Sequence, residues 1–485
     1  MTQLTPSSWK TNLDNSQAAV MEMERNGVWI DLEVCKEIEV EATKDERALL
    51  DELNPWLFEA GWFDKDCADP LPVELDDFWN SQHLHAFLHS ELGINLPPSP
   101  FWAKGRVKEG EIKVDAKALE WLAGYSKEHR PMLEKLLKLR RTRGTLKYVR
   151  KFPLFIGPDG LIHPVFGPAG DSDDRVGALS GRLACKLPEF HQIPSDKQKD
   201  AYRIRRIFGT RPGESLVVVD YSALEVVILA QILIWLFNDP GLAARVAVGA
   251  PDIHAATAYY VFTQLKDPTC LAVSEEVFIA AAKDGVGEKG LVSHCKRLRG
   301  LVKAIRYGLN YGKGAWGFGN TLFDANGDPL GEDAAQLFVD ALLAFDPGIR
   351  QFGEWVDSYV VENGGIPSLE GRWCDLSWLT ESRDKWQIKR AGRKGRNYPM
   401  QAGGADIVNL AMYLAAFDPE LRRLGFVLIL QVHDELILRG PTENAEAALK
   451  RLIEIMSTAG EKLSKPFTIP LQVSGHHGKT WDACK

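Results

Sequence analysis

Two apolar segments, 214 residues apart in the chain, each end in carboxylates. The first segment, VVVDYSALE, carries Asp220, and the second, LILQVHDELIL, carries Asp434 and Glu435. Carboxylates at the ends of buried strands are costly to desolvate and repel one another. The sequence therefore predicts that the two segments form adjacent strands and that their acids share a pair of divalent cations.

The chain is long enough for several domains, with 485 residues of which 45% are hydrophobic. Its net charge of −8 means that any nucleic-acid site must come from locally clustered basic residues. Such clusters exist at 135–151, with eight basic and no acidic residues, at 296–306, with five, and at 385–396, with six. One run alone is typical of a solvated helix face, whereas three together favour contact with a polyanion.

The seven cysteines are odd in number and never form Cys-x-x-Cys, which argues against a disulfide framework or a zinc knuckle. The most apolar stretch, 226–237, is interrupted by Gln231 and is too short to span a bilayer. We interpret it as a buried helix. These features, with no signal-like start, predict a protein of a reducing cytoplasm without a membrane partner.

Helical and strand patterns alternate along the chain. Residues 14–52 are typical of two helices separated by a turn at Asn26 and Gly27, the second opened by Asp31. A further helical pattern covers 116–149. Strands are predicted at 161–166, 215–220, 426–432 and 435–438. The last two form a hairpin whose tight turn is His433-Asp434, and a long helical block, roughly 222–360, lies between the two acidic strands.

Four side chains recur at every fourth position in RGLVKAIRYGLNYG, namely Arg299, Lys303, Tyr307 and Tyr311. On a helix they form one slanted stripe about 18 Å long. Two cations suit a triphosphate and two rings suit a base or sugar. The alternative is an amphipathic helix whose cations extend to solvent.

These segments resemble the three polymerase motifs of family A DNA polymerases, the DNA polymerase I type. DYSALE resembles the first motif (DYSQIE), RGLVKAIRYGLNYG the second (RxxxKxxxFGxxYG, with Tyr for Phe), and QVHDE the third. The resemblance continues in MERNGVWID, SGRLACKLPEFHQIP, PDIHAATA and NYPMQAGGADI, so it covers nearly the whole chain.

The resemblance implies an α+β right-hand polymerase fold, with an antiparallel palm sheet and helical fingers and thumb. The expected parts are an N-terminal helical region and thumb at 1–150, palm at 151–230 and again at 371–485, and fingers at 231–370. The basic run at 135–151 is expected to grip duplex phosphates.

The implied function is template-directed addition of deoxynucleotides to a primer 3′ end, in phage or bacterial DNA replication. Asp220 and Asp434 would bind two Mg²⁺ ions, with Mn²⁺ as an alternative metal, and Tyr221 joins the expected metal set. Lys303 is expected to donate a proton to pyrophosphate. Glu435 is expected to tune the site from its edge, and the alternative is an exposed strand-end carboxylate.

Arg299, Lys303 and His254 resemble the family's triphosphate-binding side chains, although a lone histidine near a helix start is often structural. Glu225 resembles the residue that excludes a ribose 2′-hydroxyl; the alternative is an acid in the first turn of a helix. Tyr307, in place of Phe, predicts efficient dideoxynucleotide incorporation. Tyr311 would stack where the template base enters, unless it is a core aromatic.

Five further positions match the family's contacts to the primer-template minor groove, where acceptors shared by all correct pairs report geometry and not sequence. The alternative for each is surface charge or polar packing. They are Arg182, Arg393, Asn397, Gln401 and His433.

The sequence departs from the family pattern in four places. Val227 stands where an arginine is frequent in the family. His191 and Gln192 stand where relatives commonly have Gln and Asn, so the expected site does not include His191 or Gln192. The stretch 265–292 is longer than usual and is interpreted as a surface insertion. Only about twenty residues precede MERNGVWID, which follows the proofreading domain in relatives. We therefore expect no 3′→5′ exonuclease in this chain, so that proofreading is either missing or supplied by a separate polypeptide; a separate processivity factor is the other partner considered.

Other functions stay open at this point. They are a repair or lesion-bypass polymerase of the same family, a single-subunit RNA polymerase, and a non-catalytic DNA-binding subunit. Glu225 and the chain length argue against the RNA polymerase. Asp220, Asp434, Lys303 and Arg299 argue against the non-catalytic subunit.

Overall fold

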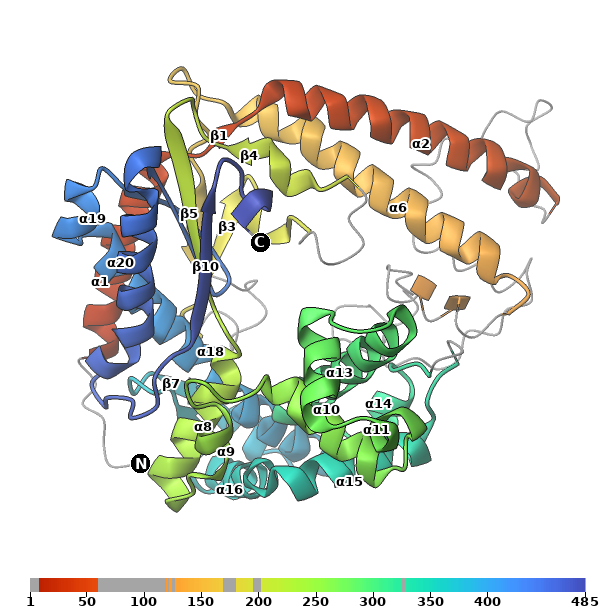
Figure 1. The fold of residues 1–485 in the computed structure, drawn as a ribbon. Helices are drawn as coiled ribbons and strands as arrows, with labels where there is room; N and C mark the ends of the chain where they lie inside the picture. Colours follow the sequence, from red (N-terminus) through yellow and green to blue (C-terminus); the bar gives the residue numbers. More distant parts are fainter. Residues whose placement is uncertain are drawn as a thin grey trace.

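A four-stranded antiparallel sheet is the platform of the molecule (Figure 1). The computed structural model describes residues 8–59, 119–120, 122–123, 127–168, 180–194, 202–324 and 328–484. The strand order in the sheet is β10-β5-β9-β8. The bounds are β5 Glu214–Tyr221, β8 Val427–Val432, β9 Glu435–Pro441 and β10 Val473–Gly478.

The central strand β5 is buried on both faces because its apolar side chains alternate between two cores. Val217 and Val219 belong to one core, whereas Leu216 and Val218 belong to the other. The second core contains the rings of Phe152, Phe190, Phe208 and Trp481. A continuous run of valines is thus what a strand sandwiched between two layers requires.

One face of the sheet is covered by α1 Ser8–Asn26, α18 Lys385–Ala416 and α20 Ala445–Thr458 (Figure 1). Side-chain amides fix α1 there: Asn12 Nδ2 donates to the Asp406 carbonyl at 3.0 Å, and Asn26 Nδ2 donates to the Leu428 carbonyl at 2.9 Å. The chain then turns at Gly27, whose φ of 63° suits glycine. The predicted break between two N-terminal helices is confirmed.

A long antiparallel helix pair extends away from the sheet (Figure 1). It consists of α2 Leu32–Glu59, capped by Asp31, and α6 Arg130–Lys151. Acids of α2 neutralise much of the basic run on α6: Glu39 pairs with Arg150, Glu46 with Arg143 and Glu52 with Lys135, each at 2.7 Å. The expected helical pattern at 116–149 lies partly outside the described residues.

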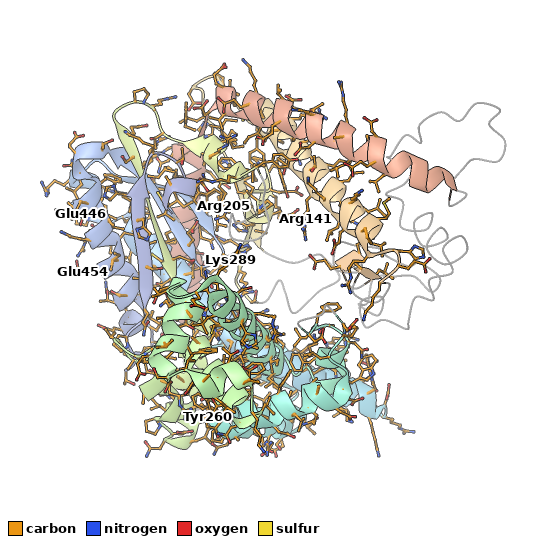
Figure 2. All side chains as sticks on the ribbon, turned by 45° about the vertical axis from the view of Figure 1, so that its right-hand side comes forward. Arg141, Arg205, Tyr260, Lys289, Glu446 and Glu454 are labelled. Atoms are coloured by element: carbon orange, nitrogen blue, oxygen red, sulfur yellow. The ribbon has the colours of Figure 1, made fainter. Side chains whose placement is uncertain are left out.

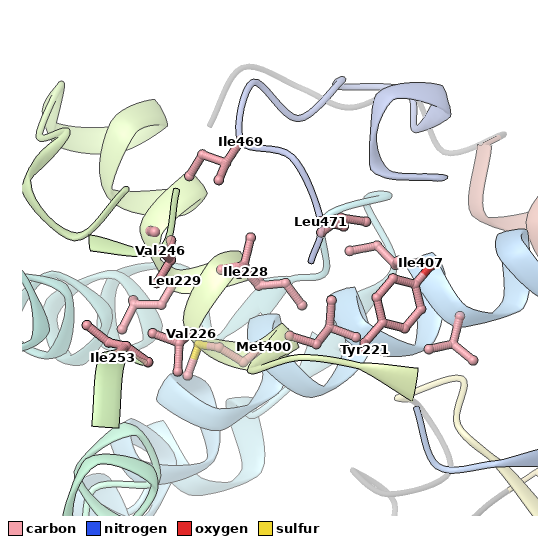
Figure 3. Packing of buried hydrophobic residues seen from close by; sticks show 14 of the residues in the cluster. Tyr221, Val226, Ile228, Leu229, Val246, Ile253, Met400, Ile407, Ile469 and Leu471 are labelled. Atoms are coloured by element: carbon pink, nitrogen blue, oxygen red, sulfur yellow. The ribbon is translucent and has the colours of Figure 1, made fainter. Parts of the chain in front are cut away.

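The block between the two acidic strands is mainly helical, as predicted. Its first helix, α8 Leu224–Phe237, is the expected buried helix, and Figure 3 shows its Ile228 and Leu229 among Met400 and Ile407 of α18 and Leu471. The longer helices that follow are α10 Ile253–Gln264, α13 Lys289–Asn310, α15 Glu332–Phe345 and α16 Pro347–Asn363.

Several short elements connect these parts. The short helices are α9 Gly241–Arg245, α11 Pro268–Ala272, α12 Glu275–Ile279, α14 Ala315–Gly319, α17 Ser377–Thr380 and α19 Pro419–Arg423. The two-stranded pairs are β1 Trp29–Ile30 with β4 Phe208–Gly209, β2 Val165–Pro168 with β3 Leu183–Leu187, and β6 Gly365–Pro367 with β7 Trp373–Asp375.

The stretch 265–292, interpreted above as a surface insertion, is anchored in the core. Cys270 of α11, Phe278 of α12 and Ala281 of the π-helix Ala280–Asp284 are all buried in the larger cluster. In the described part of the chain every cysteine is free and buried, which agrees with the absence of a disulfide framework. No helix among the described residues is long and apolar enough to cross a membrane.

Candidate active site

The two acid-bearing segments meet as the sequence predicted. In the antiparallel pairing of β5 with β9, Asp220 lies directly opposite Glu435. The Tyr221 backbone N–H donates to the Asp434 carbonyl at 3.2 Å. The hairpin turn between β8 and β9 holds His433 at φ 57°, a left-handed conformation that costs energy for a non-glycine residue. Asp220 and Asp434 therefore share one end of two neighbouring strands.

A pocket of about 450 Å³ opens at this end of the sheet. The sheet contributes the acids to its lining, and α13 faces them with a cation and two aromatic rings. Nine of the residues singled out in the sequence line it: Asp220, Tyr221, Glu225, Lys303, Tyr307, Tyr311, His433, Asp434 and Glu435.

The carboxylates of this pocket are suited to a divalent cation. Burial raises the pKa of Asp434, and the charge of Glu225 raises it further against the opposing effect of Arg182. No group of three or more His, Cys, Asp or Glu side chains in the described residues is arranged to hold a metal. Mg²⁺ usually takes only one or two carboxylates and completes its shell with water and substrate oxygens. Asp220 and Asp434 fit that donor set.

Tyr221, expected in the metal set, and Glu435, expected to tune the site from its edge, both have side chains engaged in the core. The Tyr221 side chain is buried, and its hydroxyl donates to the Met456 carbonyl at 2.8 Å, so the phenol cannot be a ligand. Its backbone N–H, in contrast, donates to the Asp434 carbonyl at the site. Glu435 is also buried and not an exposed edge residue; its Oε1 accepts from the Trp481 indole N–H at 2.6 Å.

Glu225 stands in the first turn of α8 and is held from two sides. The Tyr311 hydroxyl donates to Glu225 Oε2 at 2.7 Å, and Arg182 Nη2 donates to Oε1 at 3.0 Å. Tyr311 lies just beyond the last residue of α13. Burial and the neighbouring charge of Glu225 raise the pKa of Tyr311. Glu225 is therefore more than a first-turn acid: it is a buried carboxylate fixed at the pocket wall.

The α13 stripe divides into two halves. Lys303 and Tyr307 line the pocket, and Lys303 Nζ lies 5.9 Å from the centre of the Tyr307 ring. Arg299 instead forms a bidentate pair with Asp252, with Nε–Oδ1 at 2.9 Å and Nη2–Oδ2 at 2.8 Å. Burial opposes ionisation of Asp252, but Arg299 outweighs it and the pKa of Asp252 falls to about 2. Arg299 is absent from the lining of this pocket.

His254 lies behind the stripe and not on the pocket wall. It is buried, its ring centre is 5.6 Å from that of Tyr307, and its Nδ1 has no hydrogen-bond partner within the described ranges. Burial, followed by the charge of Arg306, lowers its pKa to about 3. The imidazole is therefore neutral here, so its expected contact with a triphosphate stays a prediction.

The expected DNA-binding residues fall in two places. Arg393, Asn397 and Gln401 lie on α18, and Gln401 hydrogen-bonds the side chain of Tyr311 at the pocket. Arg182 and His433 line a second pocket of about 240 Å³ that shares Asp434 with the first. The structure thus brings all five positions to the pocket or to the helix beside it, and their contact with DNA stays a prediction.

Comparison with known proteins identifies the family. The family model described as DNA polymerase family A matches residues 78–483. This chain belongs to DNA polymerase family A.

Two curated family A relatives illustrate the match. The chain is 28% identical over 404 residues to DNA polymerase I of Chloroflexus aurantiacus, covering 83% of this chain and 37% of that protein. It is 29% identical over 382 residues to the thermostable DNA polymerase I of Thermus aquaticus, covering 78% of this chain and 39% of the relative. The chain thus spans less than half the length of these relatives.

A solved structure supports the right-hand family A fold. The POL domain of Pol1 from M. smegmatis, solved in complex with a DNA primer-template and dNTP, superposes with a TM-score of 0.73 at 25% identity. The match covers 97% of this chain and 70% of that chain. The expected α+β architecture with a palm sheet and helical fingers and thumb is confirmed, whereas the domain boundaries stay predictions.

Two residues at or beside this pocket have no counterpart among the predicted site residues. Arg205, labelled in Figure 2, lies in the 3-10 helix Ile204–Ile207 and lines the main pocket. Its guanidinium stacks 4.0 Å from the Trp481 ring, whose indole holds Glu435. Asp252, inside PDIH, orders Arg299. The three arginines of RIRR, at 203–206, form a local basic cluster that could have indicated Arg205 as a binding residue. No local pattern indicated that Asp252 would pair with Arg299.

His191 was left out of the expected site, yet it contacts His433. The ring centres are 5.3 Å apart. The Cys185 backbone N–H donates to His191 Nδ1 at 3.4 Å, and His191 Nε2 lies 2.8 Å from the Gln431 carbonyl. Since Nδ1 accepts, Nε2 carries the proton, and burial lowers the pKa of His191 to about 4. His191 therefore packs as a neutral ring that orients the turn before Asp434.

Proposed function

We propose that this chain adds deoxynucleotides to the 3′ end of a primer annealed to a DNA template, as a DNA-directed DNA polymerase. The observation that carries the proposal is the meeting of Asp220 and Asp434 at one end of adjacent strands, opposite Lys303 and Tyr307 in one pocket. The M. smegmatis relative was solved with a primer-template and dNTP, which supports the same partners for this chain.

In this proposal Asp220 and Asp434 hold two Mg²⁺ ions. Bound there, the ions would lower the pKa of the primer 3′-hydroxyl and stabilise the charge on the leaving pyrophosphate. Lys303 faces the acids across the pocket and would contact the triphosphate and return a proton to pyrophosphate. The Tyr307 ring beside it would support the sugar.

Glu225 would select the sugar. Its carboxylate is held at the pocket wall by Tyr311 and Arg182, so it cannot swing away without breaking two hydrogen bonds. A ribose 2′-hydroxyl in the same space would meet a fixed side chain. Deoxynucleotides would therefore be used in preference to ribonucleotides.

Extension of one labelled primer-template with Mg²⁺ and either dNTPs or rNTPs tests the proposal. We expect template-directed dNTP products, little rNTP product and no product from the Asp434→Ala variant. Preferred rNTP use would indicate an RNA polymerase. Absence of any Mg²⁺-dependent or Mn²⁺-dependent product from the intact chain would indicate a non-catalytic DNA-binding protein.

The biological setting stays a prediction. Bacterial or phage replication, and the supply of proofreading or processivity by a separate protein, can be tested by extension across a long primed single strand, with and without host extract. A replicative role predicts that the extract lengthens the products. Short gap-filling products in both conditions would favour the repair alternative.

A further inference from the structure

One face of α18 carries a continuous row of polar and aromatic side chains. Trp386, Arg390, Arg393, Asn397 and Gln401 follow spacings of four, three, four and four residues, so they stay within one helix face. The row is about 22 Å long, the length of about six stacked nucleotides. It is continued sideways by Trp378 on α17.

Two tryptophans on this face are open to solvent. Trp378 is 46% exposed and Trp386 is 60% exposed. Each faces a guanidinium: Arg390 Cζ lies 5.5 Å from the Trp378 ring centre and Arg393 Cζ lies 5.3 Å from that of Trp386. Exposed rings combined with arginines form the surface on which unpaired bases stack while their phosphates are neutralised.

The charge of this face is positive. Residues 385–396 contain six basic and no acidic side chains. Two acids beside it are engaged: Asp384 caps α18 by accepting from the Trp386 N–H at 2.8 Å, and Asp357 pairs with Arg396. On α6, by contrast, three of the basic side chains form ion pairs with acids of α2. Arg390 and Arg393 instead lie against the rings of Trp378 and Trp386. Their positive charges can therefore attract a polyanion that approaches this face.

The row begins at the pocket. Gln401 hydrogen-bonds Tyr311, which lines the pocket with Asp220 and Asp434. Arg393 lies against Gly312, the residue after Tyr311: a Cβ on Gly312 would come within 2.6 Å of Arg393 Cγ. A strand leaving the pocket past Tyr311 would therefore meet Arg393 and then Trp386.

We infer that Trp378, Trp386 and Arg390, which we name the tryptophan platform, bind the unpaired template strand just ahead of the pocket. This inference rests on the proposed polymerase function. The template is favoured over a displaced strand because only the template must enter the pocket, and the platform is continuous with it through Arg393 and Gln401.

Equilibrium binding measured by fluorescence anisotropy, without nucleotides, tests the platform. The two probes are primer-templates with the same duplex and a template overhang of one nucleotide or of about eight nucleotides, slightly longer than the platform. We expect the intact chain to bind the longer overhang about tenfold more tightly. Trp378→Ala/Trp386→Ala should remove that preference and leave binding of the shorter overhang unchanged.

Matched variants separate stacking from folding and from general charge. Trp378→Phe/Trp386→Phe retains the rings and should retain most of the preference. Arg390→Ala should reduce it more than Lys385→Ala, which removes one positive charge from an exposed position on the same helix, about 140° around the helix axis from Arg390. Equal losses for Arg390→Ala and Lys385→Ala would reduce the platform to nonspecific charge and contradict the inference.

Two further outcomes overturn the inference without touching the proposed function. The first is an unchanged overhang preference in Trp378→Ala/Trp386→Ala. The second is a loss confined to a third probe that carries a displaced flap in place of the template overhang, which would assign the platform to the other strand. Asp434→Ala should retain the overhang preference while primer extension is lost. Failure of extension in the intact chain would thus count against the proposed function alone.

Discussion

The two walls of the main pocket differ in how their charged side chains are paired. One wall holds a cluster of carboxylates, whereas on the other wall cations form ion pairs within the fold. On the sheet side, which includes the first turn of α8, Asp220, Glu225, Asp434 and Glu435 line one space, and burial together with Glu225 raises the pKa of Asp434. On the helical side, two cations of α13 are neutralised within the fold. Arg299 pairs with Asp252, and the fully buried Arg306 pairs with Asp346.

The difference separates binding groups from structural ones. Like charges held together in a pocket lower the stability of the fold unless a ligand of opposite charge is bound. Neutralised pairs such as Arg306 with Asp346 instead contribute to folding. Their charges already interact with each other and therefore attract a ligand only weakly. We therefore expect substitutions on the sheet wall to remove activity while preserving stability, and substitutions at the pairs behind α13 to do the reverse.

The largest expected effect is at the sheet wall. Asp434→Ala, or Asp220→Ala, should lower the primer-extension rate by about 10³-fold or more, because a metal ligand is lost. The free energy of unfolding should stay the same or rise by about 1 kcal/mol as repulsion is relieved. Rapid-quench extension and urea unfolding measure the two quantities. Extension within tenfold of the unaltered chain would contradict the proposed metal site.

The reverse effect is expected at the buried pair behind α13. Asp346→Ala leaves Arg306 and Arg245 without their shared carboxylate and should destabilise the fold by about 3–5 kcal/mol. Urea unfolding measures it. The double change Arg306→Met/Asp346→Leu removes both charges and should recover part of the loss. A destabilisation below about 1 kcal/mol for Asp346→Ala would break the contrast between the two walls.

Sugar selection sharpens the comparison inside the sheet wall itself. Glu225→Ala should raise the ratio of ribonucleotide to deoxynucleotide incorporation by about 10²-fold, because space opens for the 2′-hydroxyl. Single-nucleotide incorporation kinetics measure the ratio. Tyr311→Phe removes the hydrogen bond to Glu225 but keeps the carboxylate, so it should change the ratio much less. Equal changes would show that positioning by Tyr311, and not bulk, is what selects the sugar.

A smaller effect is expected on the helical wall at Tyr307. Tyr307→Phe removes one hydroxyl, which is worth about tenfold if it hydrogen-bonds near the missing 3′-hydroxyl of a dideoxynucleotide. Competition between ddNTP and dNTP in primer extension should then favour dNTP more strongly. If the discrimination between ddNTP and dNTP is unchanged, the Tyr307 hydroxyl takes no part in recognising the sugar.

The smallest expected effects are on DNA binding by α6, where a lysine without an acidic partner can be compared with an arginine in an ion pair. Lys147 is exposed and has no acidic partner among the residues described, whereas Arg143 pairs with Glu46. Lys147→Ala should weaken duplex DNA binding a few-fold and lower its salt dependence by about one ion. Arg143→Ala should have less effect on DNA and cost about 1 kcal/mol or less in stability. The opposite order would mean that the α2 acids release their partners when DNA binds.

Local patterns predicted the elements of this fold well. Apolar runs bounded by acids indicated β5, β8 and β9, and the four-residue spacing indicated the Lys303–Tyr307 half of the α13 stripe, because side-chain direction follows backbone geometry over a few residues. The His433-Asp434 turn was predicted for the same reason. At the other end of the stripe, Arg299 forms an ion pair with Asp252 that no spacing within α13 reveals, and its expected contact with a triphosphate stays a prediction.

The sequence by itself determined where carboxylates, cations and rings stand along their own strands and helices, and its motifs were sufficient to indicate the family. Only the tertiary structure decided which charges are neutralised. Arg306 became a core residue, Glu435 was bound by Trp481, and the basic run of α6 met the acids of α2. Charge pairing depends on distances of a few ångströms between residues far apart in the chain, and such distances exist only after packing.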